Sequence, residues 1–146
     1  MKSALSSGRF HAVLAAGNSA ADACEFSPAK IGGSNSTALT VGSIGIKDAI
    51  SSFSNTGPCV DIYAPGENTI SSYNVDDNST TEMQGTSMAT PHVTGVVAYW
   101  AAKRADLAKD PAAMKAFLAK MALKNAITGT AIAGDKKYLL NNGQTA

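Results

Sequence analysis

The residues best suited to chemistry form one run, GTSMATPH at positions 85–92, directly before an apolar stretch with helical spacing. A serine at the start of a buried helix has its own amide at the positive end of the helix dipole, where a developing oxyanion is stabilised. Gly85 leaves room for a substrate backbone to approach. Ser87 is therefore a candidate nucleophile. The alternative, for a lone Gly-Thr-Ser, is that this serine only caps the helix.

The longer run GTSMATPHVTG, residues 85–95, closely resembles the nucleophile motif of subtilisin-like serine proteases. Four further segments resemble motifs of that family in the same order: AAGN at 15–18, SPA at 27–29, SFSN at 52–55 and DIYAPG at 61–66. The resemblance covers about residues 4–142. It is greatest for the proteinase K branch, in particular for fungal vacuolar proteinase B (cerevisin-like) enzymes.

The resemblance implies a serine endopeptidase that cleaves polypeptide substrates and needs no cofactor for its chemistry. It makes Ser87 the nucleophile, and Asn18 the side-chain donor that holds the oxyanion together with the Ser87 amide. It also implies a cis peptide bond before Pro28. The implied substrate-binding residues come from three segments and are Ala15, Ala16 and Gly17, then Ser27, Pro28 and Ala29, then Gly85 and Thr86.

A serine hydroxyl needs a base to take its proton, and neither histidine of the chain fits that role. His92 follows Ser87 by five residues, so on a helix its side chain points away from the serine. His11 lies in the strand that leads to Asn18 and lacks the Gly-Thr that follows the family's histidine. No aspartate stands in the family's Asp motif; the aspartates are Asp22, Asp48, Asp61, Asp76, Asp77, Asp106, Asp110 and Asp135.

We therefore expect the catalytic Asp and His to precede Met1, in a missing amino-terminal half of the catalytic domain, and the chain alone to be inactive. Two other function classes stay open. One is a non-catalytic fragment that acts as a binding partner or an antigen. The other is an esterase of the α/β-hydrolase type, which is disfavoured because its Gly-x-Ser-x-Gly motif needs a glycine where residue 89 is Ala.

The resemblance further implies a structural calcium ion held by Asp61 and the carbonyl groups of Ser36 and Ala38. Residues 31–35 look like an insertion relative to that branch, and a displaced loop would abolish the site. The alternative for Asp61 is a strand aspartate whose carboxylate accepts hydrogen bonds from backbone amides.

The two cysteines, Cys24 and Cys59, have no CxxC pattern or histidine-rich surroundings, which disfavours a metal site. They form either a disulfide or two buried thiols, and the resemblance implies the disulfide because fungal relatives often have both. Two N-glycosylation patterns begin at Asn35 and Asn78, although such triplets also occur by chance.

Composition excludes other functions. Twelve Lys and Arg against eleven Asp and Glu give a net charge of +1, and only 16% of residues are charged. The chain therefore lacks the strong positive electrostatic field that would bind nucleic acid or an acidic membrane surface. The first nine residues contain no apolar run typical of a secretory signal. A secreted or vacuolar location is implied by the resemblance alone.

The elements that must position these residues are three apolar runs and two helices. The runs, at 10–16, 38–44 and 59–64, are typical of buried strands, and their long connections favour a mostly parallel sheet. One helix is predicted from the turn at 84–87 to about 104, with apolar or small residues nearly all round, as in a central buried helix. A covering helix is predicted at about 111–123, with Lys115, Lys120 and Lys124 outward.

The predicted fold is thus a partial subtilisin-like α/β fold in which the buried helix starts at Ser87. Residues 1–146 form the carboxyl-terminal part of one peptidase catalytic domain. Because a divided parallel sheet leaves an apolar edge and uncovered helix faces, we expect the isolated chain to be poorly soluble or molten.

Overall fold

The computed structural model describes residues 10–144, except for the side chain of Asn35. Its centre is a parallel sheet with the order β1-β2-β3, in which Leu14 pairs with Thr40 and Val41 pairs with Ile62. The strands are β1 Val13–Ala15, β2 Leu39–Ile44 and β3 Ile62–Pro65. The predicted parallel sheet is confirmed, and each strand lies within one of the three apolar runs.

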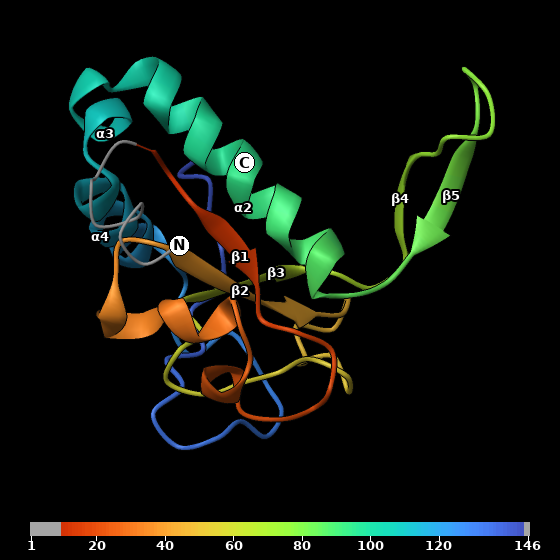
Figure 1. Ribbon diagram of the computed structural model, residues 1–146, viewed down its shortest axis with the longest axis horizontal. Helices are drawn as coiled ribbons and strands as arrows, with labels where there is room; N and C mark the ends of the chain where they lie inside the picture. The colour runs from red at the N-terminus through yellow and green to blue at the C-terminus, as the bar shows by residue number, and fades with distance from the viewer. Residues whose placement is uncertain (1–9, 145–146) are drawn as a thin grey trace.

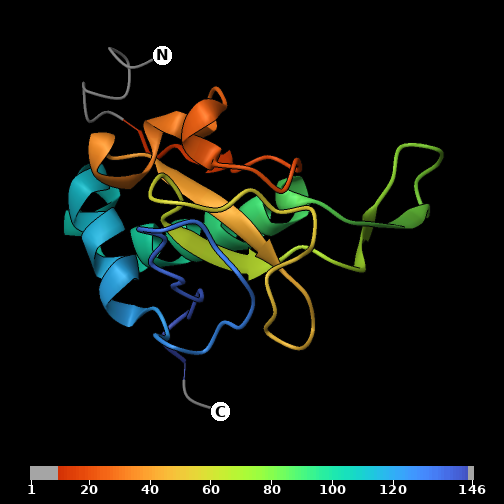
Figure 2. The ribbon, with the colours of Figure 1, turned by 90° about the horizontal axis from the view of Figure 1, so that it is seen from below.

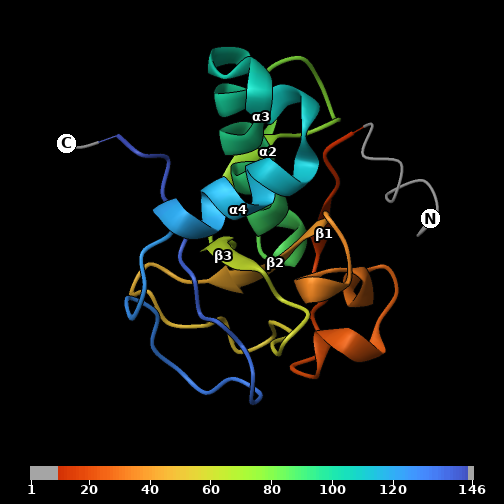
Figure 3. The same cartoon turned by 90° about the vertical axis from the view of Figure 1, so that its left-hand side faces the viewer.

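Three helices lie on one side of this sheet, as Figures 1 and 3 show. They are α2 Thr86–Lys103, α3 Ala105–Lys109 and α4 Pro111–Met121. Helix α2 packs across all three strands. Helix α4 begins after Asp110, whose carboxylate accepts hydrogen bonds from the amides of Ala112 and Ala113. Both predicted helices are confirmed, with ends close to those expected from the sequence.

Alternate residues of the strands belong to different apolar cores, as the period of two requires. Val41 and Ile62 face the helices and pack with Val93 of α2 and Leu118 of α4. Tyr63 faces the other side and packs with Ile127 and other buried residues there. The sheet is therefore covered on both faces, which explains why its strands are apolar throughout.

The second face is covered by loops and short 3₁₀ turns. The turns are η1 Ala23–Glu25, η2 Ala29–Ile31 and η3 Gly33–Asn35. A disulfide joins Cys24, in the first turn, to Cys59, close to the start of β3, so the implied pairing is confirmed. The segment around Leu139 pairs along β3 at Tyr63 and covers that edge of the sheet. Among residues 10–144, no strand pairs with the outer edge of β1.

An antiparallel hairpin projects from the body between β3 and α2, as Figures 1 and 2 show. Its strands are β4 Thr69–Ser72 and β5 Thr80–Met83. This hairpin was not predicted from the sequence. Most of its side chains are exposed, Ile70 and Val75 included, so little apolar alternation exists to reveal the strands.

Helix α2 differs from its prediction, because only one of its faces is buried. Ala89, Val93 and Val97 are buried against the sheet, whereas His92, Gly95 and Ala98 are exposed. A Cβ atom added at Gly95 would meet nothing within 4 Å. The small residues of α2 that indicated close packing on every side therefore form a solvent-exposed surface. None of the helices within residues 10–144 is long and apolar enough to span a membrane.

Candidate active site

Ser87 lies in the first turn of α2 and its side chain is exposed. The helix begins after Gly85, which has φ +149°, a value that L side chains rarely adopt. Met88 and Ala89 donate their amides to the carbonyl of Gly85, but the amide of Ser87 donates to no group within residues 10–144. A free amide proton therefore lies at the positive end of an eighteen-residue helix, beside an exposed hydroxyl.

Asn18 follows β1 and reaches the start of α2. Its Oδ1 accepts hydrogen bonds from the amide and the hydroxyl of Thr86, both at 2.9 Å. The hydroxyl of Thr86 in turn accepts the amide of Gly17 at 3.1 Å. Thr86 is fully buried, so its own end of each contact is shielded from water. Because Oδ1 is occupied, the Nδ2 end of Asn18 is the part of the side chain left to donate to another molecule.

The space at Gly85 relates the two free donors to each other. A Cβ atom added to Gly85 would lie 3.2 Å from Asn18 Nδ2 and 3.7 Å from the backbone nitrogen of Ser87. One point therefore lies near both N–H donors, and it is open because residue 85 has no side chain. Two N–H donors close to one point are what the stabilisation of an oxyanion requires.

Asn55 holds the loop that carries Asn18. It is fully buried, its Oδ1 accepts the amides of Ser19 at 2.9 Å and Ala21 at 3.1 Å, and its Nδ2 donates to the carbonyl of Ala16 at 2.9 Å. Gly17 has φ +104°, and a Cβ there would come within 2.5 Å of Asn55 Nδ2. Asn55 belongs to the motif SFSN, but its role was not predicted from the sequence.

The implied substrate-binding residues differ in exposure. Ser27 is exposed, Ala15, Gly17 and Pro28 are half-buried, and Ala16, Ala29, Gly85 and Thr86 are buried. The Ser27–Pro28 peptide bond is cis, as the resemblance implies. The amide of Ala16 donates to the carbonyl of Val41, and the carbonyl of Ala16 accepts a hydrogen bond from Asn55 Nδ2. The carbonyl of Ala29 accepts a hydrogen bond from the hydroxyl of Thr40. These backbone groups are already hydrogen-bonded within the chain. The roles of the eight residues in substrate binding stay predictions.

Both histidines contact backbone carbonyl groups rather than Ser87. A ring nitrogen of His11 lies 3.1 Å from the carbonyl oxygen of Ala108, and one of His92 lies 3.0 Å from that of Met88. Most aspartates likewise serve local structure: Asp22 caps η1, Asp106 pairs with Arg104, and Asp110 caps α4. Within residues 10–144, Ser87 has no histidine or aspartate hydrogen-bonded to it.

Tyr63 and Asp135 form a pair on the far side of the sheet from α2. The Tyr63 hydroxyl donates to Asp135 Oδ2 at 2.6 Å, and the amide of Gly57 donates to the same oxygen at 2.7 Å. Burial, together with the negative charge of Asp135, raises the pKa of Tyr63. The phenol therefore stays neutral and joins the carboxyl-terminal segment to β3.

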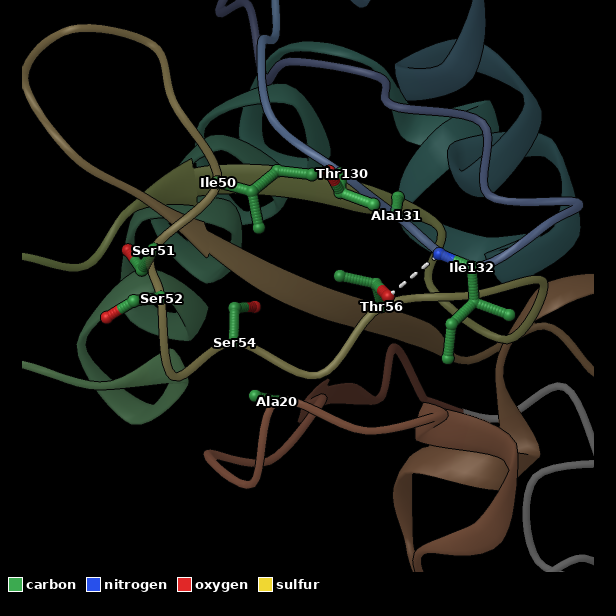
Figure 4. Close-up of a pocket in the computed structure, with 9 residues that line it drawn as sticks. All are labelled: Ala20, Ile50, Ser51, Ser52, Ser54, Thr56, Thr130, Ala131 and Ile132. Atoms are coloured by element: carbon green, nitrogen blue, oxygen red, sulfur yellow. Dashed lines mark hydrogen bonds between the residues drawn. The ribbon is translucent and has the colours of Figure 1, made fainter.

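A hollow of about 390 Å³ lies beside the loop that follows Asn18. Figure 4 shows it between the 50–56 segment and residues 130–132, where the amide of Ile132 donates to the hydroxyl of Thr56. The hollow is lined by Ala20, Ile50, Ser51, Ser52, Ser54, Thr56, Thr130, Ala131 and Ile132. None of these side chains is acidic or basic, so the hollow supplies no acid or base to Ser87.

Asp61, the implied calcium ligand, is buried beside β3. Its Oδ2 accepts the amides of Gly33 at 3.1 Å and Thr40 at 2.9 Å, which is the alternative that the sequence analysis left open. Its Oδ1 lies 3.0 Å from Lys115 Nζ. Burial raises the pKa of Asp61, while the charge of Lys115 opposes that rise. Within residues 10–144, no three His, Cys, Asp or Glu side chains gather as metal ligands.

Lys115 does not point outward as predicted. Its Nζ donates to the carbonyls of Gly33, Ser36 and Ala38, and its side chain is only 17% exposed. The helical period assigned it correctly to the flank of α4, but that flank faces the 33–38 loop, and a lysine stem is long enough to reach the loop carbonyls. The carbonyls of Ser36 and Ala38, implied to bind calcium, therefore surround an ammonium group, and the oxygen set does not fit a metal ion while that group is there.

Comparisons with known proteins agree with this geometry. The model of the subtilase family, Peptidase S8, matches residues 2–143. The subtilase-type proteinase psp3 of Schizosaccharomyces pombe is 43% identical over 129 residues, which are 88% of this chain and 28% of that protein. An alkaline extracellular protease of Yarrowia lipolytica is 50% identical over 92 residues, or 60% of this chain and 20% of that protein.

The fold is also similar to solved structures. The crystal structure of a cold adapted subtilisin-like serine proteinase superposes with a TM-score of 0.84 and 39% identity, covering 99% of this chain and 49% of that one. This chain therefore spans about half or less of the length of each of these three proteins.

Proposed function

Because this chain belongs to the subtilase family, we propose that it supplies the nucleophile and the oxyanion hole of a serine endopeptidase. Ser87 Oγ attacks the carbonyl carbon of a peptide bond, and a histidine outside this chain takes the hydroxyl proton. Asn18 Nδ2 and the Ser87 amide donate hydrogen bonds to the oxygen that becomes negative. The leaving amine then receives the proton, and water releases the acyl group from Ser87.

The observation that carries this proposal is the pair of unused donors beside Gly85. Asn18 Nδ2 and the Ser87 amide nitrogen lie 3.2 Å and 3.7 Å from the same point beside Gly85, and both Asn18 and Ser87 are exposed residues. A serine that served only as a helix cap would not require a second donor, from the loop that carries Asn18, close to the same point.

We also propose that the catalytic Asp and His, and the other side of the substrate groove, belong to an amino-terminal half outside this chain. Two surfaces support this. The outer edge of β1 has no strand partner within residues 10–144, and the face of α2 that includes Gly95 and Ala98 is exposed. In a complete domain an added strand and helix would cover such surfaces.

A secreted or vacuolar location fits the covalent features of the chain. The disulfide between Cys24 and Cys59 is the kind of bond that persists in oxidising compartments. Asn78 is exposed between β4 and β5, where a glycan would meet no buried group. The side chain of Asn35 lies outside the described part of the structure. The relative from Yarrowia lipolytica is named as an extracellular protease.

A fluorophosphonate probe tests the proposal, because it reacts with a serine only where a base and an oxyanion hole activate it. We expect labelling of Ser87 when an upstream half that contains Asp and His is added, and none for the chain alone or for Ser87→Ala. Labelling of the chain alone would show that the base is already present. No labelling with both halves assembled would favour the non-catalytic binding partner instead.

A further inference from the structure

We propose that the ammonium group of Lys115 occupies the cation position between Asp61 and the 33–38 loop, so that this chain holds a tethered cation where the family resemblance implies a calcium ion. The inference is independent of the peptidase activity, because the site lies at α4 and β3 and shares no residue with Ser87 or Asn18. Lys115 would then stabilise the 33–38 loop and exclude a calcium ion from the site.

Four oxygen atoms surround Lys115 Nζ. The carbonyl oxygens of Gly33, Ala38 and Ser36 lie at 2.5, 2.7 and 3.1 Å, and Asp61 Oδ1 lies at 3.0 Å. Three of these oxygens are those implied as calcium ligands, from Asp61, Ser36 and Ala38. Carbonyl and carboxylate oxygens are the donor set that a hard cation prefers, and here the cation at their centre is a side chain of the same protein.

The bonding capacity of the ammonium group matches this set. Lysine has three N–H donors, and the three carbonyls use all of them. Asp61 Oδ1 is buried and accepts no hydrogen bond within residues 10–144. It therefore contributes its negative charge at 3.0 Å, as an oxygen ligand would toward a metal ion. A second cation, Lys136, stays 3.9 Å from the same oxygen and is more exposed.

Residues 31–35, which resemble an insertion, complete the cage of four oxygen atoms around Lys115 Nζ. Gly33, within residues 31–35, donates its amide to Asp61 Oδ2 and offers its carbonyl to Lys115. The insertion therefore supplies one contact to each member of the ion pair. Asp61 is 4% exposed, so a calcium ion could enter only by displacing the ammonium, because two cations in one cage of four oxygens would repel each other.

Two consequences follow. A metal ion stabilises a fold only in proportion to its free concentration relative to its dissociation constant, whereas a lysine on α4 is always present. The 33–38 loop is thus fastened to α4 without dependence on calcium. Removing the ammonium should, conversely, leave an oxygen cage able to accept a cation from solution.

Competitive acetylation of the unaltered chain, assembled with its upstream half so that the fold is complete, tests the first consequence. Trace acetic anhydride reacts with each free amine, and mass spectrometry gives the relative rates at Lys115 and at Lys120, an exposed lysine of the same helix. We expect Lys115 to react at least about tenfold more slowly, because hydrogen bonds of a charged donor are worth that much or more. The ratio should be the same in EDTA and in millimolar calcium. Equal rates, or faster reaction of Lys115 in calcium, would overturn the proposal.

The variant Lys115→Met, assembled with the same upstream half, tests the second consequence, with Lys120→Met as the matched control. Methionine keeps an apolar stem of similar shape but has no charge. We expect calcium to slow amide hydrogen exchange of residues 33–38 in Lys115→Met, and to have no effect on those amides in the unaltered chain or in Lys120→Met. If calcium does not affect Lys115→Met, the oxygen cage is not a cation site. A calcium effect in the unaltered chain would mean that the ammonium does not fill it.

Discussion

The side-chain oxygen of Asn18 accepts two hydrogen bonds from Thr86, one from the backbone amide and one from the hydroxyl. These bonds join residues 68 positions apart in the chain and fasten the loop after β1 to the start of α2. Since the nitrogen of a carboxamide donates hydrogen bonds and does not accept them, these two bonds also determine which end of the Asn18 carboxamide is free. Thr86 therefore orients the donor, and Ser87 next to it provides the nucleophile.

Replacing Asn18 by alanine should lower kcat of the enzyme assembled with its upstream half, with little change in KM. The lost donor acts on the oxyanion, which exists in the transition state and not in the bound substrate. Removing the corresponding donor of subtilisin, a member of the same family, costs about 10²–10³-fold in turnover, and we expect a loss of that order. Steady-state kinetics on a peptide substrate measure it. Asn78→Ala, in the exposed hairpin, is the control, and an unchanged kcat for Asn18→Ala would refute the role of this side chain.

The variant Thr86→Val separates orientation of the donor from its presence. Valine has the shape of threonine but lacks the hydroxyl that donates to Asn18 Oδ1 and accepts the amide of Gly17. The backbone bond from residue 86 to Asn18 stays, and of the two hydrogen bonds that are lost only the one to Oδ1 holds the donor side chain directly. We therefore expect kcat to fall by only roughly 2–10-fold, as for one neutral hydrogen bond.

The matched control is Thr90→Val, which loses the 2.8 Å bond from its hydroxyl to the carbonyl of Thr86 one turn along the same helix. We expect its kcat to stay close to that of the unaltered enzyme. Equal losses in both variants would mean that the effect comes from helix stability and not from Asn18.

Much of the framework could be predicted from the sequence because its signals are local. The strands at 13–15, 39–44 and 62–65 lie in continuous apolar runs, and α2 begins at the turn that Gly85 makes. The resemblance also identified Asn18 and Ser87, whose closeness depends on a parallel sheet that delivers the end of β1 to the start of a helix packed on it.

Other features could not be predicted because they depend on which surfaces meet. Helical spacing places Lys115 on a flank of α4, but only the tertiary structure shows that the flank faces the carbonyls of the 33–38 loop. The same limit applies to α2. Its composition is that of a helix buried all round, yet the exposed face at Gly95 has no neighbour within residues 10–144 to cover it.

Replacing both Cys24 and Cys59 by alanine should destabilise the assembled protein by about 3–4 kcal/mol on the chain-entropy model. The disulfide closes a segment with a sequence separation of 35 and so restricts the unfolded chain. Equilibrium urea unfolding, with and without a reductant, measures the change. The reductant should shift the unaltered protein toward the variant and leave the variant itself unchanged. A variant that matches the unaltered protein under oxidising conditions would contradict the prediction.

Asn55 should affect both stability and catalysis, because it holds the loop that carries Asn18. Asn55→Leu keeps a side chain of similar size but leaves the amides of Ser19 and Ala21 and the carbonyl of Ala16 without their partner. We expect a loss of roughly 2–4 kcal/mol in the free energy of unfolding, since each abandoned buried group carries its own desolvation cost.

The rate of fluorophosphonate labelling per folded molecule then distinguishes positioning from mere stabilisation. If Asn55 positions Asn18, the labelling rate of Asn55→Leu falls even under conditions where the protein stays fully folded, because the loop can shift the donor away from the oxyanion. Ser52→Ala, an exposed change in the same segment, should alter neither stability nor labelling. A destabilised Asn55→Leu protein with the normal labelling rate would show that this asparagine supports the fold alone, and that the contacts of Asn18 with Thr86 suffice to aim its amide.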